Sequence, residues 1–555
     1  MFRSSTKSYQ LEVFSSVSSF LSGSSLKVYE SSEGWHNLFR EHVTLRIDEE
    51  IFRPLFCQDD GAPNASIRVL VAMMILKESR GWSDAQLFEE CRFNLLIRSA
   101  LFLPNINDSL PAISTYYLLR KRIVEWEKSG NVNLIEQVFA QITKSQAIEF
   151  DVNGKKIRMD SKLIGSNIAW YNRYELIHET VRKAYPYIKS VMQALLLNES
   201  EIQLLESIAG ESGNKVSYRS SKSEIESKMA SLGTVIYKII GQMSSHSSEE
   251  MQTLCRIFEN QYIENESVIT PRPKEQISTG SVQSPHDTDC HYRNKDGNQV
   301  KGYAINITET CSTDNSLNLI TNVLTDVVSR ADCDFLQPAI AASQEVISQK
   351  IEAINSDGAY HSVDNQSYCK EKKIDFILGA IQGKMSRYDL AWNDKGELVV
   401  TDLTTNTICP VQRVNSRKSE SPPKWVIRTE EGKNRYFTQK EIDTCLLRKQ
   451  TGSRTKEELN VRNNVEATIF QLGYHYPNDK SRYRGLIKHK MWANVRCLWV
   501  NFVRIVNFII QTGLTFVKNT IKLSILSKLW INFVEMVFGM CAVENCCPAF
   551  SKNEN

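Results

Sequence analysis

The pattern of apolar and polar positions changes several times along the chain, and it first predicts short helices between residues 35 and 150. Residues 66–77 are apolar on one face, and a capping-box sequence at 83–86 begins the next helix. A later helix, capped by Ser114, carries three consecutive basic side chains: Arg120, Lys121 and Arg122. These helices are typical of a helix-turn-helix-like DNA-binding domain, although on pattern alone a helical bundle with solvated charges is the favoured interpretation.

Alternating apolar and polar residues replace the helical repeat near Lys156, which predicts a strand that ends at Asp160. Ile157 and Met159 face one side of this strand, and Asp160 faces the other. Similar strand-like stretches follow at 303–307, before Asp357 and at 375–381. The pattern predicts an α/β domain formed by 151–385 and 455–505, with a helical insertion at 174–268.

Short strand-like pieces separated by turn residues predict a β-rich insertion at 386–454. The helix after it has one apolar face, and Arg462 and Glu466 lie one turn apart on the adjoining face. Gly473 is the expected end of this helix. Basic residues interleaved with aromatic ones come next, a pattern that suits a nucleic-acid backbone with exposed bases: Lys480, Arg482, Arg484, Lys488 and Lys490.

The two ends of the chain differ from its middle. Residues 1–34 are rich in serine and lack the apolar core of a signal peptide, so we expect a flexible segment. Residues 506–555 are apolar but interrupted by charges, and their longest uncharged run is shorter than the ~20 residues of a membrane helix. We expect a helical tail that packs on the protein, and contact with a membrane surface is the alternative.

Composition agrees with a globular protein of several domains. The chain has 555 residues, 41% hydrophobic and 24% charged, with a formal net charge of +3. A surface for a polyanion must therefore come from local clusters of Lys and Arg. The cysteines form no Cys-x-x-Cys pair, which indicates free thiols; a zinc site in the tail at Cys541, Cys546 and Cys547 is the alternative.

Three acidic residues stand in three different settings, because Asp160 and Asp357 follow strands whereas Glu466 lies in a helix. Mg²⁺ prefers oxygen ligands, and a pair of such ions about 3.5–4 Å apart suits phosphodiester chemistry. Each of these residues alone is more often a turn residue or a solvated helix residue. Their combination and order favour a metal site.

Four stretches, in this order, carry a resemblance to a known family. They are Gly-Trp-Ser-Asp-Ala-Gln-Leu-Phe-Glu-Glu-Cys-Arg-Phe-Asn from Gly81, Arg-Met-Asp-Ser-Lys-Leu-Ile-Gly from Arg158, Ser-Asp-Gly-Ala-Tyr from Ser356, and Arg-Asn-Asn-Val-Glu-Ala-Thr-Ile-Phe from Arg462. Together they resemble the DDE transposases of bacterial insertion sequences, over most of the chain from about residue 36 to 505. The resemblance implies an α/β fold with an RNase H-like mixed sheet flanked by helices.

The resemblance also implies roles for individual residues. Asp160, Asp357 and Glu466 would hold two Mg²⁺ ions, for which Mn²⁺ can substitute. Arg462 matches the arginine of the family and would contact a phosphate near the cut.

Two positions depart from the pattern of this family. Leu459 stands where a tyrosine is expected, and Gly473 stands where a lysine is expected. Lys480 or Lys488 is the candidate substitute for that lysine.

The activity implied by the resemblance is Mg²⁺-dependent hydrolysis and strand transfer at the terminal inverted repeats of a mobile element. The expected DNA-binding residues are Arg462, Lys480, Arg482, Arg484, Lys488, Lys490, Arg120, Lys121 and Arg122. The expected partners are double-stranded DNA, as element ends and target, and a second copy of the chain on paired ends, in the bacterial cytoplasm at the nucleoid. No small-molecule substrate is expected, and the alternative is a decayed or domesticated relative that binds DNA without cutting it.

Overall fold

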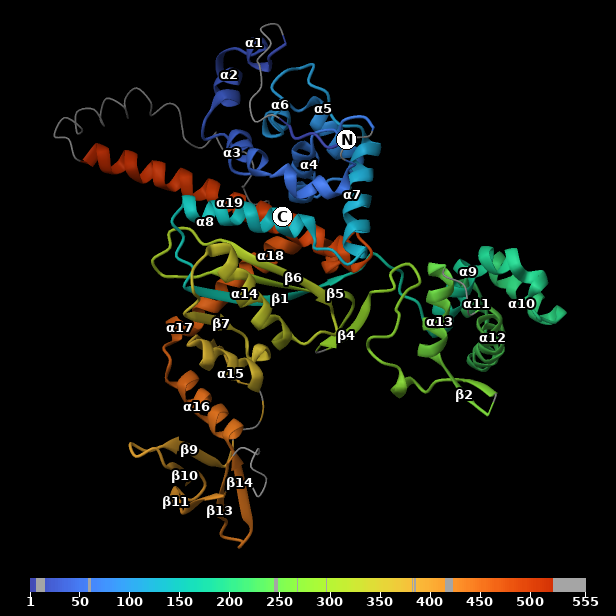
Figure 1. The fold of residues 1–555 in the computed structure, drawn as a ribbon, viewed down its shortest axis with the longest axis vertical. Coiled ribbons are helices and arrows are strands. Elements are labelled where there is room, and N and C mark those ends of the chain that lie inside the picture. The colour runs from blue at the N-terminus through green and yellow to red at the C-terminus, as the bar shows by residue number, and fades with distance from the viewer. Residues whose placement is uncertain are drawn as a thin grey trace.

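The computed structural model describes residues 1–5, 15–57, 61–243, 248–266, 268–295, 297–381, 383, 386–414 and 423–522. Figure 1 shows a helical N-terminal domain above a central sheet, a helical insertion to one side and a β-rich lobe below. Expectations for Cys541, Cys546, Cys547 and the tail beyond residue 522 lie outside the described residues.

The N-terminal domain is helical, as predicted. Its helices are α1 Val17–Phe20, α2 Gly23–Glu30, α3 Trp35–His42, α4 Ile67–Arg80, α5 Asp84–Phe93, α6 Leu95–Ala100, α7 Ile113–Lys128 and α8 Leu134–Glu149. Helix α5 has the expected capping box between Ser83 and Gln86. The expected cap at Ser114 is wrong, because α7 already begins at Ile113 and its cap position, Ala112, offers no side-chain acceptor. The segment expected to be flexible contains α1 and α2, and Val17 of α1 is buried.

The central sheet has six strands: β1 Lys156–Gly165, β4 His291–Lys295, β5 Asn298–Thr310, β6 Ile320–Val327, β7 Ala353–Ser356 and β8 Asp375–Leu378. The strand order is β6-β5-β1-β7-β8, and β4 pairs with the first part of β5. Strand β5 pairs antiparallel with both β1 and β6. Strand β7 pairs parallel with β1, and β8 pairs parallel with β7. The fold class is therefore α/β with a mixed sheet.

Helices pack against strands of this sheet and enclose its core. They are α14 Leu336–Ile347, α15 Val363–Lys372, α18 Asn464–Gly473 and α19 Leu486–Lys522, and the short helix α17 Lys456–Asn460 precedes α18. Ile157 and Met159 of β1 are buried in the same core cluster as Phe335 and Ile340, as the alternation in the sequence predicts.

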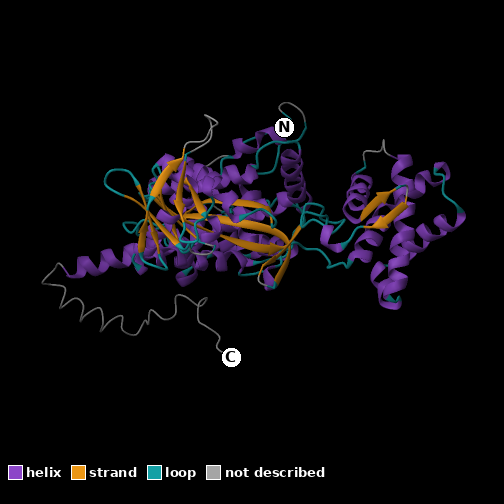
Figure 2. Ribbon diagram, turned by 90° about the horizontal axis from the view of Figure 1, so that it is seen from below, coloured by secondary structure: helices purple, strands orange, loops and turns teal. Residues whose placement is uncertain are grey.

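Two insertions project from the sheet, and each has a core of its own. The helical insertion comprises α9 Arg173–Val191, α10 Glu199–Gly210, α11 Gly213–Arg219, α12 Lys222–Met243, α13 Glu249–Gln261 and the hairpin β2 Tyr262–Asn265 and β3 Val268–Pro271. Figure 2 shows it joined to the rest by a narrow connection. The β-rich lobe comprises β9 Tyr388–Trp392, β10 Leu398–Asp402, β11 Thr407–Cys409, β12 Val411–Val414, β13 Lys424–Arg428, β14 Asn434–Thr438 and α16 Gln439–Ser453.

Helix α19 connects the N-terminal domain to the sheet, because it packs against α4, α8 and β6. Its apolar residues form part of the main core, with Trp492, Leu498 and Phe502 fully or almost fully buried. Its segment Leu486–Gly513 is long and apolar enough to span a membrane by length and composition, but 56% of its most apolar window is buried inside the protein. Packing inside the protein therefore explains the apolar composition of this described part of the helix.

Candidate active site

Asp160 and Asp357 lie close to each other on neighbouring parallel strands. The expected end of the first strand at Asp160 is wrong, because β1 continues to Gly165 and Asp160 lies within it, whereas Asp357 directly follows β7. In the pairing of β1 with β7, Arg158 stands opposite Asn355, so the two aspartates, each two residues further on, come at the same level. Because side chains two residues apart face the same side of a strand, Asp160 faces the side of Arg158, and Asp357 faces the side of Asn355. Both carboxylates are therefore on one side of the sheet. Asp357 also begins the 3₁₀ turn Gly358–Tyr360, and its Oδ1 accepts a hydrogen bond from the Gly358 backbone N–H at 2.5 Å.

Glu466 reaches this place on helix α18, which packs along β1. Val465, Thr468 and Leu472 are the buried side of the helix, and Glu466 is on its open side with a side chain 63% exposed. The 3₁₀ turn Val461–Asn463 precedes the helix and is fixed to β1 by a hydrogen bond from Arg158 Nη1 to the Val461 carbonyl oxygen at 3.0 Å.

Arg462 links two of the three acids through a single nitrogen. Its Nη2 lies 3.3 Å from Asp160 Oδ2 and 3.6 Å from Glu466 Oε1. The other terminal nitrogen faces Gly379 directly after β8, 3.8 Å from where a Cβ would stand. The guanidinium therefore lies between the Asp160 and Glu466 carboxylates, with its other terminal nitrogen near the end of β8.

Burial raises the pKa of Asp160 above its usual value, and the negative charge of Asp357 raises it further. The Ser161 backbone N–H and Arg462 oppose this shift of the pKa. The effect of Asp357 on this pKa shows that the two aspartates are electrostatic neighbours. Two neighbouring carboxylates with one raised pKa are typical of a site that binds a cation or a proton.

The fit of a metal ion to this site depends on Arg462. Among the described residues, no three His, Cys, Asp or Glu side chains are grouped closely enough to hold a metal ion. The positive charge between Asp160 and Glu466 is instead the guanidinium. The three acids are the all-oxygen donor type that Mg²⁺ prefers, and a shared ion would require their side chains to come closer together than they stand here.

A second cluster of charged side chains, centred on Glu309, lies beside the first and was not predicted from the sequence. Glu309 of β5 is fully buried, and it accepts hydrogen bonds from Arg158 Nε at 2.6 Å, Arg504 Nη2 at 2.7 Å and Thr468 Oγ1 at 2.8 Å. These donors come from β1, α19 and α18. The cluster thus fixes the helix of Glu466 to the sheet. The available signal in the sequence was a single acidic residue at the end of a strand with alternating apolar residues.

The Lys162 side chain packs against Gly473 and occupies the space that a side chain at this position would need. A Cβ at this position would lie 3.0 Å from Lys162 Nζ, so the Lys162 side chain of β1 fills the space beside the helix. Lys162 forms an ion pair with Asp479 at 2.7 Å. The structure therefore places a lysine from another part of the chain next to the position where the sequence lacks one, and it is neither Lys480 nor Lys488.

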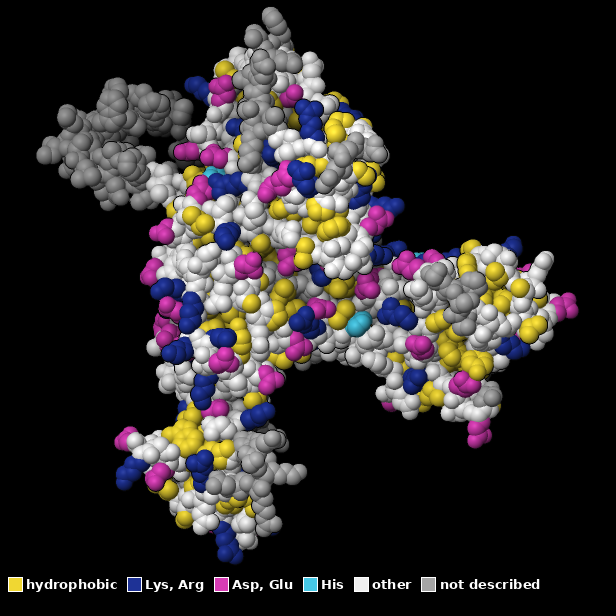
Figure 3. Space-filling model, in the orientation of Figure 1, with side chains coloured by type: hydrophobic (Ala, Val, Ile, Leu, Met, Phe, Trp, Pro, Cys, Tyr) yellow, Lys and Arg dark blue, Asp and Glu magenta, His cyan; other side chains and the backbone are white. Residues whose placement is uncertain are grey.

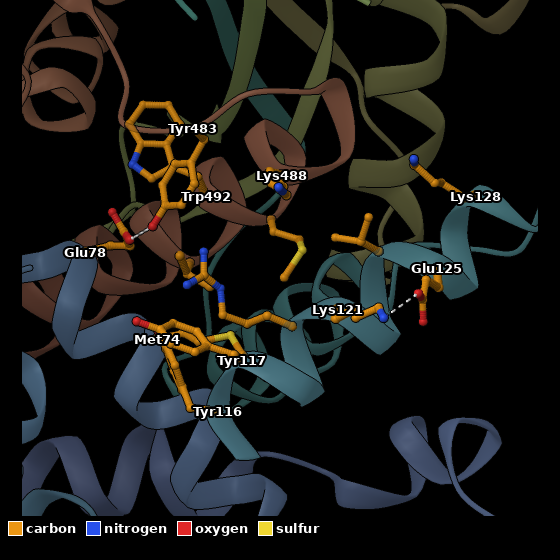
Figure 4. A pocket seen from close by; sticks show the side chains of 14 residues that line it. Met74, Glu78, Tyr116, Tyr117, Lys121, Glu125, Lys128, Tyr483, Lys488 and Trp492 are labelled. Carbon is orange, nitrogen blue, oxygen red and sulfur yellow. Dashed lines mark hydrogen bonds and ion pairs between the residues drawn. The ribbon is translucent and has the colours of Figure 1, made fainter. Parts of the chain in front are cut away.

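Several of the expected DNA-binding residues come together although they are far apart in the sequence. Arg120 of the N-terminal domain stacks on Tyr483 at 5.6 Å, close to Lys488. A hollow of about 540 Å³ is lined by Arg120, Arg482, Arg484 and Lys488. An adjoining cavity of about 430 Å³ lies between α4, α7 and the start of α19 (Figure 4). Figure 3 shows Lys and Arg mixed with Asp and Glu over the visible face, so the basic surface is local.

The remaining expected DNA-binding residues have partners inside the protein. Lys490 pairs with Glu127 at 2.8 Å, and Lys121 pairs with Glu125 at 3.5 Å. The Arg122 guanidinium lies 5.2 Å from the Phe56 ring centroid. The Lys480 ammonium donates to the Ile168 carbonyl oxygen at 3.0 Å. None of these four side chains is among the residues that line the hollow.

Comparison with known proteins finds a similarity for part of the chain. Residues 31–122 match the family described as Transposase domain (DUF772). The match confirms the expected likeness to transposases over this segment, which runs from just before α3 into α7 and includes Arg120, Lys121 and Arg122. No curated protein and no solved structure matches the chain.

Proposed function

We propose that this chain is a DDE transposase, in which Asp160, Asp357 and Glu466 form the catalytic site of an RNase H-like domain. The observation that carries the proposal is the register of β1 and β7, which brings two aspartates 197 positions apart in sequence to one level. The strand order β6-β5-β1-β7-β8, antiparallel on one side of β1 and parallel on the other, supports the RNase H-like assignment. The match of residues 31–122 to a transposase domain supports DNA as the substrate.

The residues of the chain then have separate tasks. Asp160 and Asp357 offer oxygens from the sheet, and Glu466 offers them from the facing helix. Two Mg²⁺ ions, or Mn²⁺, held by these three acids would supply an activated water and stabilise the leaving 3′-oxygen. The released 3′-hydroxyl attacks target DNA at the same site, so a Ser, Tyr or Cys nucleophile has no task in this reaction.

Arg462 couples DNA binding to this site. A guanidinium binds a phosphate through two parallel hydrogen bonds, which is a stronger arrangement than its long contacts with Asp160 and Glu466. A phosphodiester that enters the site draws Arg462 away from the acids. The acids then lose their positive partner at the moment when the substrate arrives, and they are free to bind metal.

DNA beyond the cut is held by the basic residues that meet near Tyr483. Arg120, Arg482, Arg484 and Lys488 line one hollow next to the segment that matches a transposase domain, and they suit the backbone of an inverted repeat. Cutting and joining two element ends requires two copies of the chain on paired DNA. The reaction belongs to the bacterial cytoplasm, where the DNA is.

Cleavage of DNA from the two flanks of the coding region tests the proposal. The purified full chain should cut these duplexes in Mg²⁺ or Mn²⁺, and Asp160→Asn, Asp357→Asn and Glu466→Gln should each abolish cutting. Asp394→Asn, at an exposed acid of the β-rich lobe, is the matched control and should leave cutting unchanged. Cutting that survives any of the three substitutions contradicts the site.

The second candidate function is DNA binding without cleavage, by a decayed or domesticated relative. It is favoured by the position of Arg462 between the acids and by the departures at Leu459 and Gly473. Binding of the flanking duplexes with no cutting in either metal would select this candidate.

A further inference from the structure

A second basic hollow, which we call the β1 groove, begins next to the proposed catalytic site. It has a volume of about 590 Å³, and its lining includes Lys162, Trp170, Lys295, Lys301 and Lys480. Lys162 follows Asp160 by two residues on β1, so the groove starts on the side of the sheet that carries the carboxylate. Four lysines face one acid, Asp479, among the described residues that line it.

The acid in the groove already has a lysine partner, whereas two of the lysines have no carboxylate partner among the described residues. Asp479 pairs with Lys162 at 2.7 Å. No ion pair with a carboxylate of the described residues is formed by Lys295 or Lys301. Burial lowers the pKa of Lys301, which means that its ammonium is short of stabilising partners. An anion in the groove would supply that stabilisation.

Trp170 gives the groove an aromatic wall. Its side chain is 52% exposed, and the Lys301 ammonium lies 5.0 Å from its ring centroid. A large exposed aromatic ring beside lysines is the arrangement with which proteins hold single-stranded nucleic acid, since bases stack on the ring and phosphates meet the cations.

The rim of the groove is held in an unusual backbone conformation. Asn478 and Asp479 have φ values of 56° and 51°, in the left-handed region that ordinary residues avoid. The segment is fixed to the end of β1 because the Ser481 backbone N–H donates to the Gly165 carbonyl oxygen at 2.8 Å. Asn and Asp adopt this region more readily than other non-glycine residues, which suits them to this position at the rim.

We propose that the β1 groove binds a single DNA strand that runs from the proposed catalytic site, with an unpaired base stacked on Trp170. From Asp160 to Gly165 the protein strand covers about 17 Å at ~3.3 Å per residue. The lysines of the groove hold the backbone of the DNA strand over this distance. The position of the groove relative to the cut rests on the proposed function, but the binding of a single strand does not.

Binding of a labelled oligothymidylate of about twelve nucleotides to the full chain, measured by fluorescence anisotropy in Ca²⁺, tests the groove. Trp170→Ala should weaken binding about fivefold to a hundredfold, as loss of one stacked base does, and Trp170→Tyr should retain most of it. Lys301→Ala should lower the dependence of log affinity on log salt by about 0.7, the value for one phosphate contact with a single strand. Tyr218→Ala, at a 90% exposed aromatic residue of the helical insertion, is the control and should change nothing.

Two results would overturn the inference: wild-type protein that does not bind the oligonucleotide, or Trp170→Ala protein that binds it as the control does. Failure of the proposed function looks different, because cutting of the flanking duplexes in Mg²⁺ would be absent while the effect of Trp170→Ala on binding remained. If Asp160→Asn abolishes cutting while Trp170→Ala leaves binding of the oligonucleotide unchanged, the proposed function stands and the inference about the β1 groove is wrong.

Discussion

Two clusters of carboxylates and arginines connect helix α18 to strand β1, and they differ mainly in burial. Glu309 is inaccessible and has two arginines and a threonine as partners. Asp160 and Glu466 share one arginine at longer distances, and Glu466 is open to solvent. Removal of one partner from a buried cluster destabilises the structure, because it leaves a buried charge without its partner. An open cluster with long contacts can exchange its partner for a ligand.

The largest expected effect is on the open cluster. Asp160→Asn should reduce DNA cutting at least about a thousandfold, because a metal ligand supplies several kcal/mol of transition-state stabilisation and each 1.4 kcal/mol is tenfold. The thermal midpoint should not fall. Single-turnover cutting and calorimetry measure the two quantities, and a loss of activity that came only with unfolding would contradict the comparison.

The next effect is on the buried cluster. Glu309→Gln should cost about 3–5 kcal/mol of unfolding free energy, since both Arg158 and Arg504 lose their charged partner. The measurement is chemical denaturation. Thr468→Val, which removes one neutral donor from the same cluster, is the control and should cost only about 1 kcal/mol. Equal costs for the two variants would show that the charge of Glu309 does not matter.

A smaller effect should follow from removal of the shared arginine. Arg462→Ala should bind Mn²⁺ about fivefold more tightly than wild-type protein in the absence of DNA, because a partly exposed ion pair contributes up to about 1 kcal/mol. The same variant should cut DNA more slowly, because the phosphate contact is lost. Titration calorimetry checks the first expectation. Arg462→Lys, which keeps the charge, should keep the wild-type Mn²⁺ affinity.

The smallest effect concerns pH. The folded protein raises the pKa of Asp160, so the folded state holds this proton more tightly than the unfolded state, where aspartate titrates near about 3.9. The stabilisation that proton binding at Asp160 gives to the folded state is complete below the pKa of the unfolded state. It is lost as the pH rises through the raised pKa of the folded state. Asp160→Asn should therefore increase the melting temperature over wild type at pH 7, and the increase should vanish toward pH 3.5. An increase that stays constant with pH would contradict a raised pKa.

The sequence by itself determined the local elements and their chemistry. Alternation predicted β1 and the burial of Ile157 and Met159, and the capping-box residues predicted the start of α5. These features depend on neighbours a few residues away, which the sequence displays directly. The Ser114 cap failed because α7 begins at Ile113, one residue earlier, without a side-chain cap.

Only the tertiary structure decided which distant residues meet. The register of β1 with β7 sets Asp160 beside Asp357, and no local pattern contains that register. The same holds for Lys162 beside Gly473, for Arg120 beside Tyr483 and for the two arginines on Glu309. The physical reason is that burial and pairing across long separations are properties of the packed chain, and they determine whether a given carboxylate stabilises the fold or stays open to a ligand.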